Sequence, residues 1–307
     1  MNDPTDLTRR EFAARAAALG AASLLPSLAL AQTPAATFIS RAIPGSGERV
    51  PAVGLGTSRV FDVGSDPAKR AALTEVLRNL VAGGGAIIDT ATSYGSSEGV
   101  VGDLVANAGL RKQVFIATKL RAADASELRG SLERLRTEQV DLLQFHNVRD
   151  PNQELGQFRA WKSAGVCRYV GITSTSQRDY AAVEAVLARE KPDFLQTDYS
   201  LDDRDVEERL LPLAAEMKVA VLTALPFGRG RLFRAVRGKT LPDWAKEFDA
   251  ESWAQFFLKF LLGSETVTAV IPGTSDAAHM ADNLGAMHGR LPDAAQRKRM
   301  VEFLQSI

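Results

Sequence analysis

The stretch "AIIDTA", residues 86–91, is one of eight short apolar runs that decide the fold of this chain. Helical patterns such as "AKRAALTEVLRNLVAGG" separate the runs, which start near residues 52, 86, 114, 140, 169, 193, 219 and 267. Strands that alternate with helices at this spacing form parallel βαβ units. Eight units favour a closed (β/α)8 barrel, and no G-x-G-x-x-G turn of a Rossmann domain follows the first run. The sequence therefore predicts an α/β protein with a TIM barrel fold.

Three segments are expected to add to this barrel. In "FISRAIPGSGERVPAVGLG", residues 38–56, the Gly-Ser-Gly-Glu between two extended runs predicts an N-terminal β-hairpin. Residues 226–251, rich in Gly, Arg and Pro, are expected to form an extended loop. The pattern "QRKRMVEFLQSI", residues 296–307, predicts a C-terminal helix packed on the barrel exterior. Because no linker interrupts the chain, residues 34–307 are expected to form one domain.

The composition excludes several classes of function. The chain of 307 residues balances 37 Lys and Arg against 37 Asp and Glu, and no basic stripe interleaved with aromatics favours nucleic acid. Cys167 is the single cysteine, which rules out an internal disulfide and a cysteine-based metal site. With only three histidines, no metal site is expected.

The first 33 residues differ from the rest. "LTRREFAARAAALGAASLLPSLALAQT" contains Arg9 and Arg10, an alanine-rich apolar stretch, and a small-x-small ending at residues 29–31. The segment resembles a twin-arginine (Tat) signal peptide that is removed near Gln32, which implies the Tat export machinery as a partner and a periplasmic or otherwise exported protein. The alternatives are an amphipathic helix on a cytoplasmic protein or a membrane anchor. We expect no stable membrane span in the mature chain.

Four polar residues follow the ends of three consecutive predicted strands. Asp89 ends the second run, Tyr94 lies in the loop after it, Lys119 ends "VFIATK", and His146 ends "VDLLQFH". The carboxyl ends of barrel strands meet at the active face, so these side chains are expected to share one mouth.

These four groups suit protonation of an oxygen on which negative charge develops. A phenol can donate the proton, an ammonium stabilises the resulting phenolate, and a carboxylate keeps a buried ammonium charged. An imidazole can hold the substrate oxygen against the phenol. The electrons must then come from a hydride donor.

The same residues resemble the Asp-Tyr-Lys-His tetrad of the aldo-keto reductase family. The resemblance covers residues 40 to about 306 and includes "VGLGT" at 53, "DTATSYG" at 89, "FIATK" at 115, "VGITS" at 170, "LPFGRGRL" at 225 and "IPGTS" at 271. It implies reduction of an aldehyde or ketone to an alcohol. A monomer is expected. Tyr94 would be the general acid, Lys119 its ammonium partner, Asp89 the support of Lys119, and His146 the group that orients the carbonyl.

The resemblance also implies a nicotinamide cofactor and its contacts. The nicotinamide end would meet Thr173, Ser174 and Gln196. The other cofactor candidates are Gly56 and Thr57, the pyrophosphate loop with Leu225, Phe227, Gly228, Arg229 and Gly230, and the adenosine end with Thr274, His279, Asp282 and Asn283.

Three positions depart from the family pattern. Thr173-Ser174 stands where Ser-Asn is common, and Ala224 stands where many members stack an aromatic on the nicotinamide. Gly273 and His279 replace a Lys and an Arg that NADPH-preferring members often use for the 2′-phosphate. NADPH is expected first, with NADH as the second choice.

Two other functions stay open. A barrel that binds the nicotinamide cofactor without catalysis, as a sensor, fits the altered cofactor positions. A lyase or isomerase with Lys119 as a Schiff base is disfavoured, because a lysine paired with a carboxylate stays protonated. Neither the carbonyl substrate nor the supply of reduced cofactor outside the cytoplasm can be read from the sequence.

Overall fold

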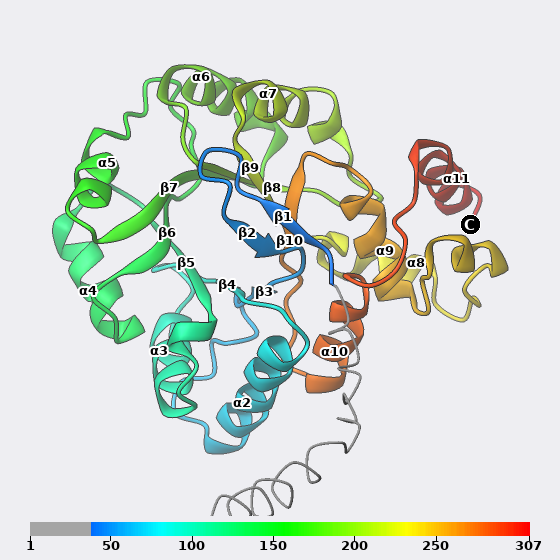
Figure 1. Ribbon diagram of the computed structural model, residues 1–307, viewed down its shortest axis with the longest axis horizontal. Helices are drawn as coiled ribbons and strands as arrows, with labels where there is room; N and C mark the ends of the chain where they lie inside the picture. Colours follow the sequence, from blue (N-terminus) through cyan, green and yellow to red (C-terminus); the bar gives the residue numbers. More distant parts are fainter. Residues whose placement is uncertain (1–37) are drawn as a thin grey trace, which may run out of the picture. The chain divides into compact units, whose positions relative to one another are not determined.

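The structure, a computed structural model, describes residues 38–307, so the predicted export signal lies outside the described residues. Parallel strands β3 to β10 pair in chain order around a central axis (Figure 1). Their bounds are β3 Leu55–Gly56, β4 Ile87–Asp89, β5 Phe115–Leu120, β6 Val140–Phe145, β7 Cys167–Ser174, β8 Phe194–Asp198, β9 Ala220–Ala224 and β10 Val267–Val270. The predicted alternation of strand and helix is confirmed.

Helices cover the outer face of the strands. The connecting helices are α2 Pro67–Ala82, α3 Ser97–Asn107, α4 Ala125–Leu135, α5 Gly156–Ser163, α6 Tyr180–Glu190, α7 Leu210–Met217, α9 Trp253–Leu262 and α10 Ala277–Gly285. Aspartate side chains accept backbone N–H groups at the start of α2, α4 and α10, which satisfies donors that a helix leaves unpaired. None of the helices within residues 38–307 is long and apolar enough to cross a bilayer.

The first and last strands meet and close the barrel. Val53 and Gly56 form parallel bridges with Val270 and Gly273. A Cβ on Gly56 would lie 2.9 Å from the Ile271 carbonyl oxygen, closer than Cβ atoms approach in proteins. A glycine at this position therefore allows the two chain segments to pack edge to edge.

The alternation of side chains along each strand sorts the barrel interior into layers. Inward-facing Ile87, Phe115 and Leu142 belong to one buried apolar cluster inside the barrel. Two residues further along β4 and β6, the inward positions are the polar Asp89 and Gln144, and in β5 Lys119 follows four residues after Phe115. The barrel is thus filled with apolar side chains below and lined with polar ones at the carboxyl ends of its strands.

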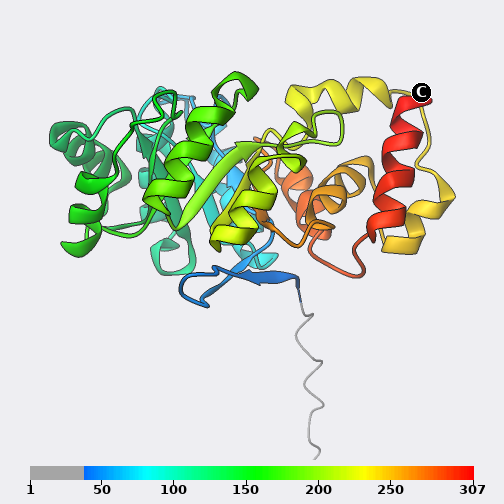
Figure 2. The same ribbon diagram turned by 90° about the horizontal axis from the view of Figure 1, so that it is seen from above.

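A β-hairpin lies against the opposite end of the barrel. Strands β1 (Ser40–Ala42) and β2 (Arg49–Pro51) pair antiparallel, and Ile43 and Val50 pack against the apolar cluster of the interior. The half-buried Arg41 guanidinium donates to the carbonyls of Leu262, Ser264 and Val267, which ties the hairpin to the end of α9 and the start of β10. Figure 2 shows the hairpin in blue at the end of the barrel away from the yellow segment around α8 (Arg231–Ala235).

The segment 226–251, expected as an extended loop, contains short helical turns. Besides α8 it holds the 3-10 turns η4 (Gly228–Gly230) and η5 (Asp243–Phe248). Apolar side chains explain the difference, because Leu232 and Phe248 are buried and hold these turns in place. The glycine and proline content of the segment does not predict such turns. The other 3-10 turns are η1 Arg111–Gln113, η2 Gln177–Asp179 and η3 Asp205–Glu207.

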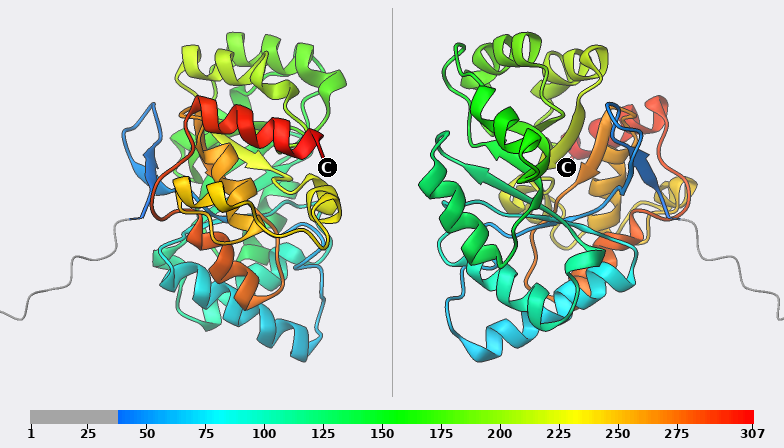
Figure 3. Two further views of the ribbon diagram at one scale, coloured as in Figure 1. Left: turned by 90° about the vertical axis from the view of Figure 1, so that its right-hand side faces the viewer. Right: turned by 60° about the vertical axis from the view of Figure 1, so that its left-hand side comes forward.

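Helix α11 (Ala294–Gln305) ends the chain on the outside of the barrel (Figure 3). Asp293 and Gln296 form a capping box at its start. Phe303 stacks on Trp253 with ring centroids 6.1 Å apart, and Arg297 donates to Glu207 at 2.6 Å. The helix therefore packs away from the mouth of the barrel, against α9 and the segment after β8.

Candidate active site

Asp89 and Lys119 form a buried ion pair at the mouth of the barrel. Lys119 Nζ donates to both Asp89 carboxylate oxygens at 2.7 Å and to the Thr90 carbonyl at 2.8 Å. The two side chains are 4% and 1% exposed. Burial raises the pKa of Asp89. At Lys119 burial lowers the pKa, but the charges and hydrogen bonds of Asp89 and Tyr94 together outweigh burial, and the pKa of the lysine is raised. The ammonium is thus fixed in place and kept charged.

Two glutamine amides extend this pair across the barrel. Gln196 Nε2 donates to Asp89 Oδ2 at 3.2 Å, and Gln144 Nε2 donates to Gln196 Oε1 at 2.9 Å. The Asp89 carboxylate is therefore held by side chains from β5, β6 and β8.

Tyr94 and His146 lie above the ammonium on neighbouring loops. Lys119 Nζ is 5.1 Å from the centroid of the Tyr94 ring, and the Tyr94 and His146 rings meet edge to face at 5.8 Å. Burial, with help from the Lys119 charge, lowers the pKa of His146 to about 4. The imidazole is therefore neutral near pH 7 and keeps one N–H to donate.

These four side chains line one cavity of about 630 Å³. Its wall also contains seven of the residues expected at the cofactor, namely Gly56, Thr173, Gln196, Leu225, Phe227, Arg229 and Gly230. The structure thus brings the predicted tetrad together with residues predicted to contact the nicotinamide and the pyrophosphate of the cofactor.

Seven other expected cofactor residues lie outside this wall. Thr57 is buried, and its hydroxyl donates to the Asp89 carbonyl at 2.9 Å. Ser174 is buried, and the neighbouring Thr175 lines the cavity instead. The remaining five are Gly228, Thr274, His279, Asp282 and Asn283.

The residues expected at the adenosine end gather around α10. Thr274 lies beside Asp276, whose carboxylate caps the helix and accepts the His279 N–H at 3.0 Å. Asp282 faces α9, where it accepts hydrogen bonds from Ser252 and Gln255 at 2.8 Å. Its carboxylate is thus already engaged within the protein.

The loop after β9 has an unusual backbone. Leu225, Gly228, Arg229 and Gly230 all have φ between 53° and 81°, in the left-handed region. A Cβ on Gly228 would lie 2.6 Å from an oxygen of Asp202, so glycine is required where the loop passes that side chain. The "LPFGRG" segment is therefore a defined turn over the cavity and not a solvated linker.

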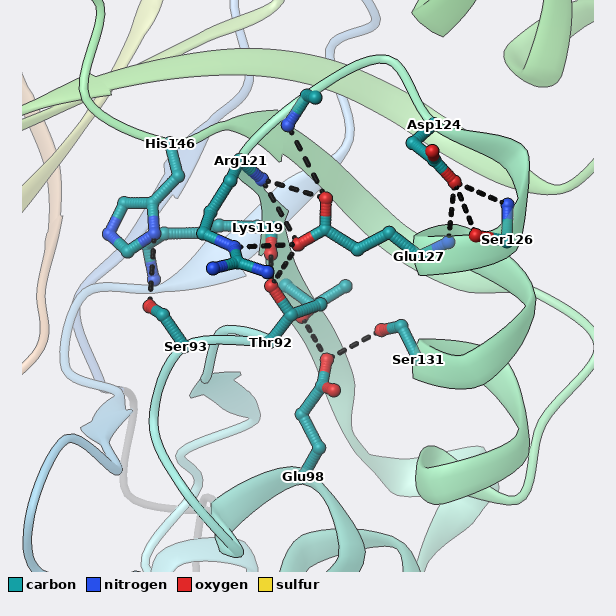
Figure 4. A network of polar contacts seen from close by, with 12 residues as sticks. Thr92, Ser93, Glu98, Lys119, Arg121, Asp124, Ser126, Glu127, Ser131 and His146 are labelled. Carbon is teal, nitrogen blue, oxygen red and sulfur yellow. Dashed lines mark hydrogen bonds and ion pairs between the residues drawn. The ribbon is translucent and has the colours of Figure 1, made fainter.

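A network of polar contacts holds the Tyr94 loop to the loop after β5 (Figure 4). The Thr92 hydroxyl donates to Glu127 at 2.6 Å, and Glu127 also accepts the backbone N–H of Arg121 at 3.2 Å. Beneath them, buried Glu98 accepts hydrogen bonds from Thr118 and Ser131. The loop that carries Tyr94 is thus anchored on α3, β5 and α4.

Seven residues of the cavity wall were not predicted from the sequence: Ser58, Arg59, Val60, Asn147, Thr175, Phe233 and Ile271. Ala224 and Gly273, predicted as departures from the family pattern, and Pro226 of the predicted pyrophosphate loop also line the cavity. Most of the seven unpredicted residues directly follow a strand or an already selected residue. The position just past each strand end is the signal that could have found them.

Comparison with known proteins agrees with this geometry. The model of the "Aldo/keto reductase family" matches residues 52–303. The aldo-keto reductase YhdN of Bacillus subtilis is 29% identical over 226 residues, which cover 67% of this chain and 66% of that protein. The methylglyoxal reductase YeaE of Escherichia coli is 27% identical over 258 residues, which cover 80% of this chain and 88% of that protein.

Solved structures share the fold. An aldo/keto reductase from Klebsiella pneumoniae in complex with NADP and acetate is 24% identical, with a TM-score of 0.71 over 86% of this chain and 94% of that one. The holo form of an aldo-keto reductase from Bacillus halodurans is 25% identical, with a TM-score of 0.70 over 87% and 96%. The matched family model spans most of the barrel, and the chain belongs to the aldo/keto reductase family.

Proposed function

We propose that this protein is an NADPH-dependent reductase that converts an aldehyde or ketone into an alcohol. One observation carries the proposal: the charged Asp89–Lys119 pair, the Tyr94 phenol and the neutral His146 imidazole line a single cavity. Family membership and the NADP(H) complexes of structural neighbours support the same activity.

The lining of the cavity supports the nicotinamide end and the pyrophosphate of a dinucleotide cofactor. Thr173 and Gln196 offer polar groups near the tetrad, and Phe227 and Phe233 form an apolar wall further along. Arg59 and Arg229 add two guanidinium groups for an anionic cofactor. We assign the nicotinamide end to Thr173 and Gln196, and the pyrophosphate to the loop 225–230. NADPH is the first choice and NADH the second.

In the proposed reaction, bound NADPH supplies a hydride to the carbonyl carbon. Tyr94 gives its proton to the carbonyl oxygen, and the Lys119 ammonium stabilises the negative charge left on the phenol oxygen. Asp89 keeps that ammonium charged and oriented. The neutral His146 donates a hydrogen bond that holds the carbonyl oxygen near Tyr94.

Two measurements test the function. Titration with NADPH and NADH, followed by cofactor fluorescence, measures binding, and cofactor oxidation with a panel of aldehydes and ketones measures turnover. We expect NADPH to bind and at least one carbonyl to be reduced. Binding without turnover of any carbonyl would favour the sensing barrel, and a protein that binds neither cofactor would contradict both functions.

We further propose that the chain is made with a Tat signal in residues 1–33 and exported after folding. Arg9 and Arg10 followed by the Ala-rich stretch support this proposal. Cell fractionation of the natural chain and of the Arg9→Lys/Arg10→Lys variant tests it. The natural chain should be shortened and periplasmic and the variant retained; a full-length natural chain in the cytosol would refute export.

A further inference from the structure

A second cavity shares part of its wall with the catalytic cavity. It has a volume of about 470 Å³ and is lined by Ser93, Arg121, Phe145, His146, Asn147, Arg149, Asp150 and Gln153. His146 and Asn147 also belong to the wall of the catalytic cavity. A substrate whose carbonyl reaches Tyr94 and His146 can therefore extend its other end into this second cavity.

Two arginines give the second cavity an excess of hydrogen-bond donors. Arg149 is exposed, and no ion pair within residues 38–307 engages its guanidinium. The guanidinium of Arg121 contacts Glu127 only through Nε, at 3.3 Å, and the Arg121 side chain is 74% exposed. Each guanidinium thus keeps donors in a geometry that matches a carboxylate.

The acidic groups nearby offset part of this charge, but their oxygens also have other donors. Glu127 already accepts the Thr92 hydroxyl and the backbone N–H groups of Arg121 and Ala122. Asp150, the acid in the cavity wall, accepts the Asn152 N–H at 2.8 Å. Arg121 therefore keeps donors beyond its Nε contact with Glu127, and the Arg149 guanidinium has no ion-pair partner within residues 38–307, so both offer donors to a ligand.

The positive field also reaches the catalytic imidazole. After burial and the Lys119 charge, Arg121 and Arg149 further lower the pKa of His146, and Glu127 opposes them. The two guanidinium groups thus lie near enough to His146, with which they share the wall of the second cavity, to act on its charge.

We infer that the preferred substrate is a carbonyl compound that carries a carboxylate, held by Arg121 and Arg149 while its carbonyl lies between Tyr94 and His146. This inference rests on the proposed function. It assigns Arg121 and Arg149 the role of specificity-determining residues, whereas the reduction itself stays with the tetrad.

Two pairs of aldehydes test the inference, because each pair differs chiefly in charge. Para-formylbenzoate is compared with its methyl ester, and the flexible succinate semialdehyde with butanal. The measured quantity is the ratio of kcat/KM for the anion to kcat/KM for the neutral partner, at saturating NADPH. We expect a ratio of at least about ten in one pair, arising mainly in KM and falling as salt is raised.

Variants locate the effect. Arg149→Gln and Arg121→Gln should each lower the ratio several-fold, and the double variant should bring it close to one. Arg129→Gln is the matched control, because Arg129 is exposed on α4 and lines neither of the two cavities. It should keep the natural ratio.

The outcomes separate the inference from the function. Turnover of neutral aldehydes without preference for either anion, or a preference that survives in the double variant, overturns the inference and leaves the reductase. Absence of turnover for all four aldehydes and for a wider carbonyl panel overturns the reductase and the inference with it.

Discussion

Loss of one member of the buried Asp89–Lys119 pair should harm the fold more than loss of both. Lys119 Nζ contacts both Asp89 oxygens at 2.7 Å, and neither side chain is more than 4% exposed. At an effective dielectric constant of about 20, two unit charges at this separation attract by about 6 kcal/mol. Most of that attraction offsets the cost of removing both charges from water, so the net value of the pair is small.

The single variants lack this compensation. Asp89→Asn leaves an ammonium among buried groups, and Lys119→Met leaves a carboxylate there; each change should lower the free energy of unfolding by about 3–5 kcal/mol. The double variant buries two neutral groups of similar size. Its loss should therefore be smaller than either single loss, so it falls short of their sum by more than about 3–5 kcal/mol.

Urea unfolding followed by circular dichroism measures all four proteins, and thermal midpoints should fall by about 10 °C in each single variant. In Lys119→Met, burial still raises the pKa of Asp89. The folded state then binds the proton more tightly than the unfolded one, so stability is present at low pH and is lost as pH rises. This variant should be more stable at pH about 5 than at about 8.

Strict additivity of the two single losses would refute the reasoning, because it would show that the two charges do not interact in the folded protein. A Lys119→Met variant with no pH dependence between these values would refute the assigned burial of Asp89.

Three further predictions concern other residues of the site. Tyr94→Phe should reduce kcat by about 10²–10⁴ while NADPH binding, measured by fluorescence, persists; unchanged turnover would remove Tyr94 from the mechanism. Because the pKa of His146 is lowered to about 4 from 6.5, the stability it contributes is present above pH 6.5 and is lost as pH falls toward 4. Discounted for solvent screening, this loss of folding stability is about 1–2 kcal/mol. Imidazole NMR titration measures the pKa of His146, with the His146→Asn variant as the control. Glu98→Gln should cost about 2–3 kcal/mol in urea unfolding, since Glu98 is 1% exposed and accepts from Thr118, Ser131 and Arg134; a loss no larger than that of exposed Glu133→Gln would contradict its role.

Most of the barrel could be predicted because strand, helix and loop differ in the period of their apolar residues. The eight expected strand starts fall within three residues of the observed ones, from Leu55 to Val267. The segment 226–251 could not be predicted in the same way. Its short turns are ordered by tertiary burial of Leu232 and Phe248, which no local pattern reports.

The catalytic residues at strand ends could be predicted from the sequence, but the residues that form the cavity walls around them could not. Asp89, Lys119 and His146 could be selected because strand ends fix where their side chains point. Side chains from separate loops, such as Arg121 and Arg149, converge only when the barrel closes. The hydrogen bond from Thr92 to Glu127 spans 35 residues and also leaves no sequence signal.

The seam between residues 53–56 and 270–273 has a consequence for biosynthesis. These segments supply the two edges that close the barrel, yet they lie roughly 220 residues apart, or about 10–40 s of translation at 5–20 residues per second. A nascent chain must therefore carry β3 with one edge unpaired until β10 leaves the ribosome. Unpaired strand edges recruit other chains, so this interval exposes the protein to aggregation and to chaperones. Transport machinery that accepts only folded cargo would have to wait for the last strand.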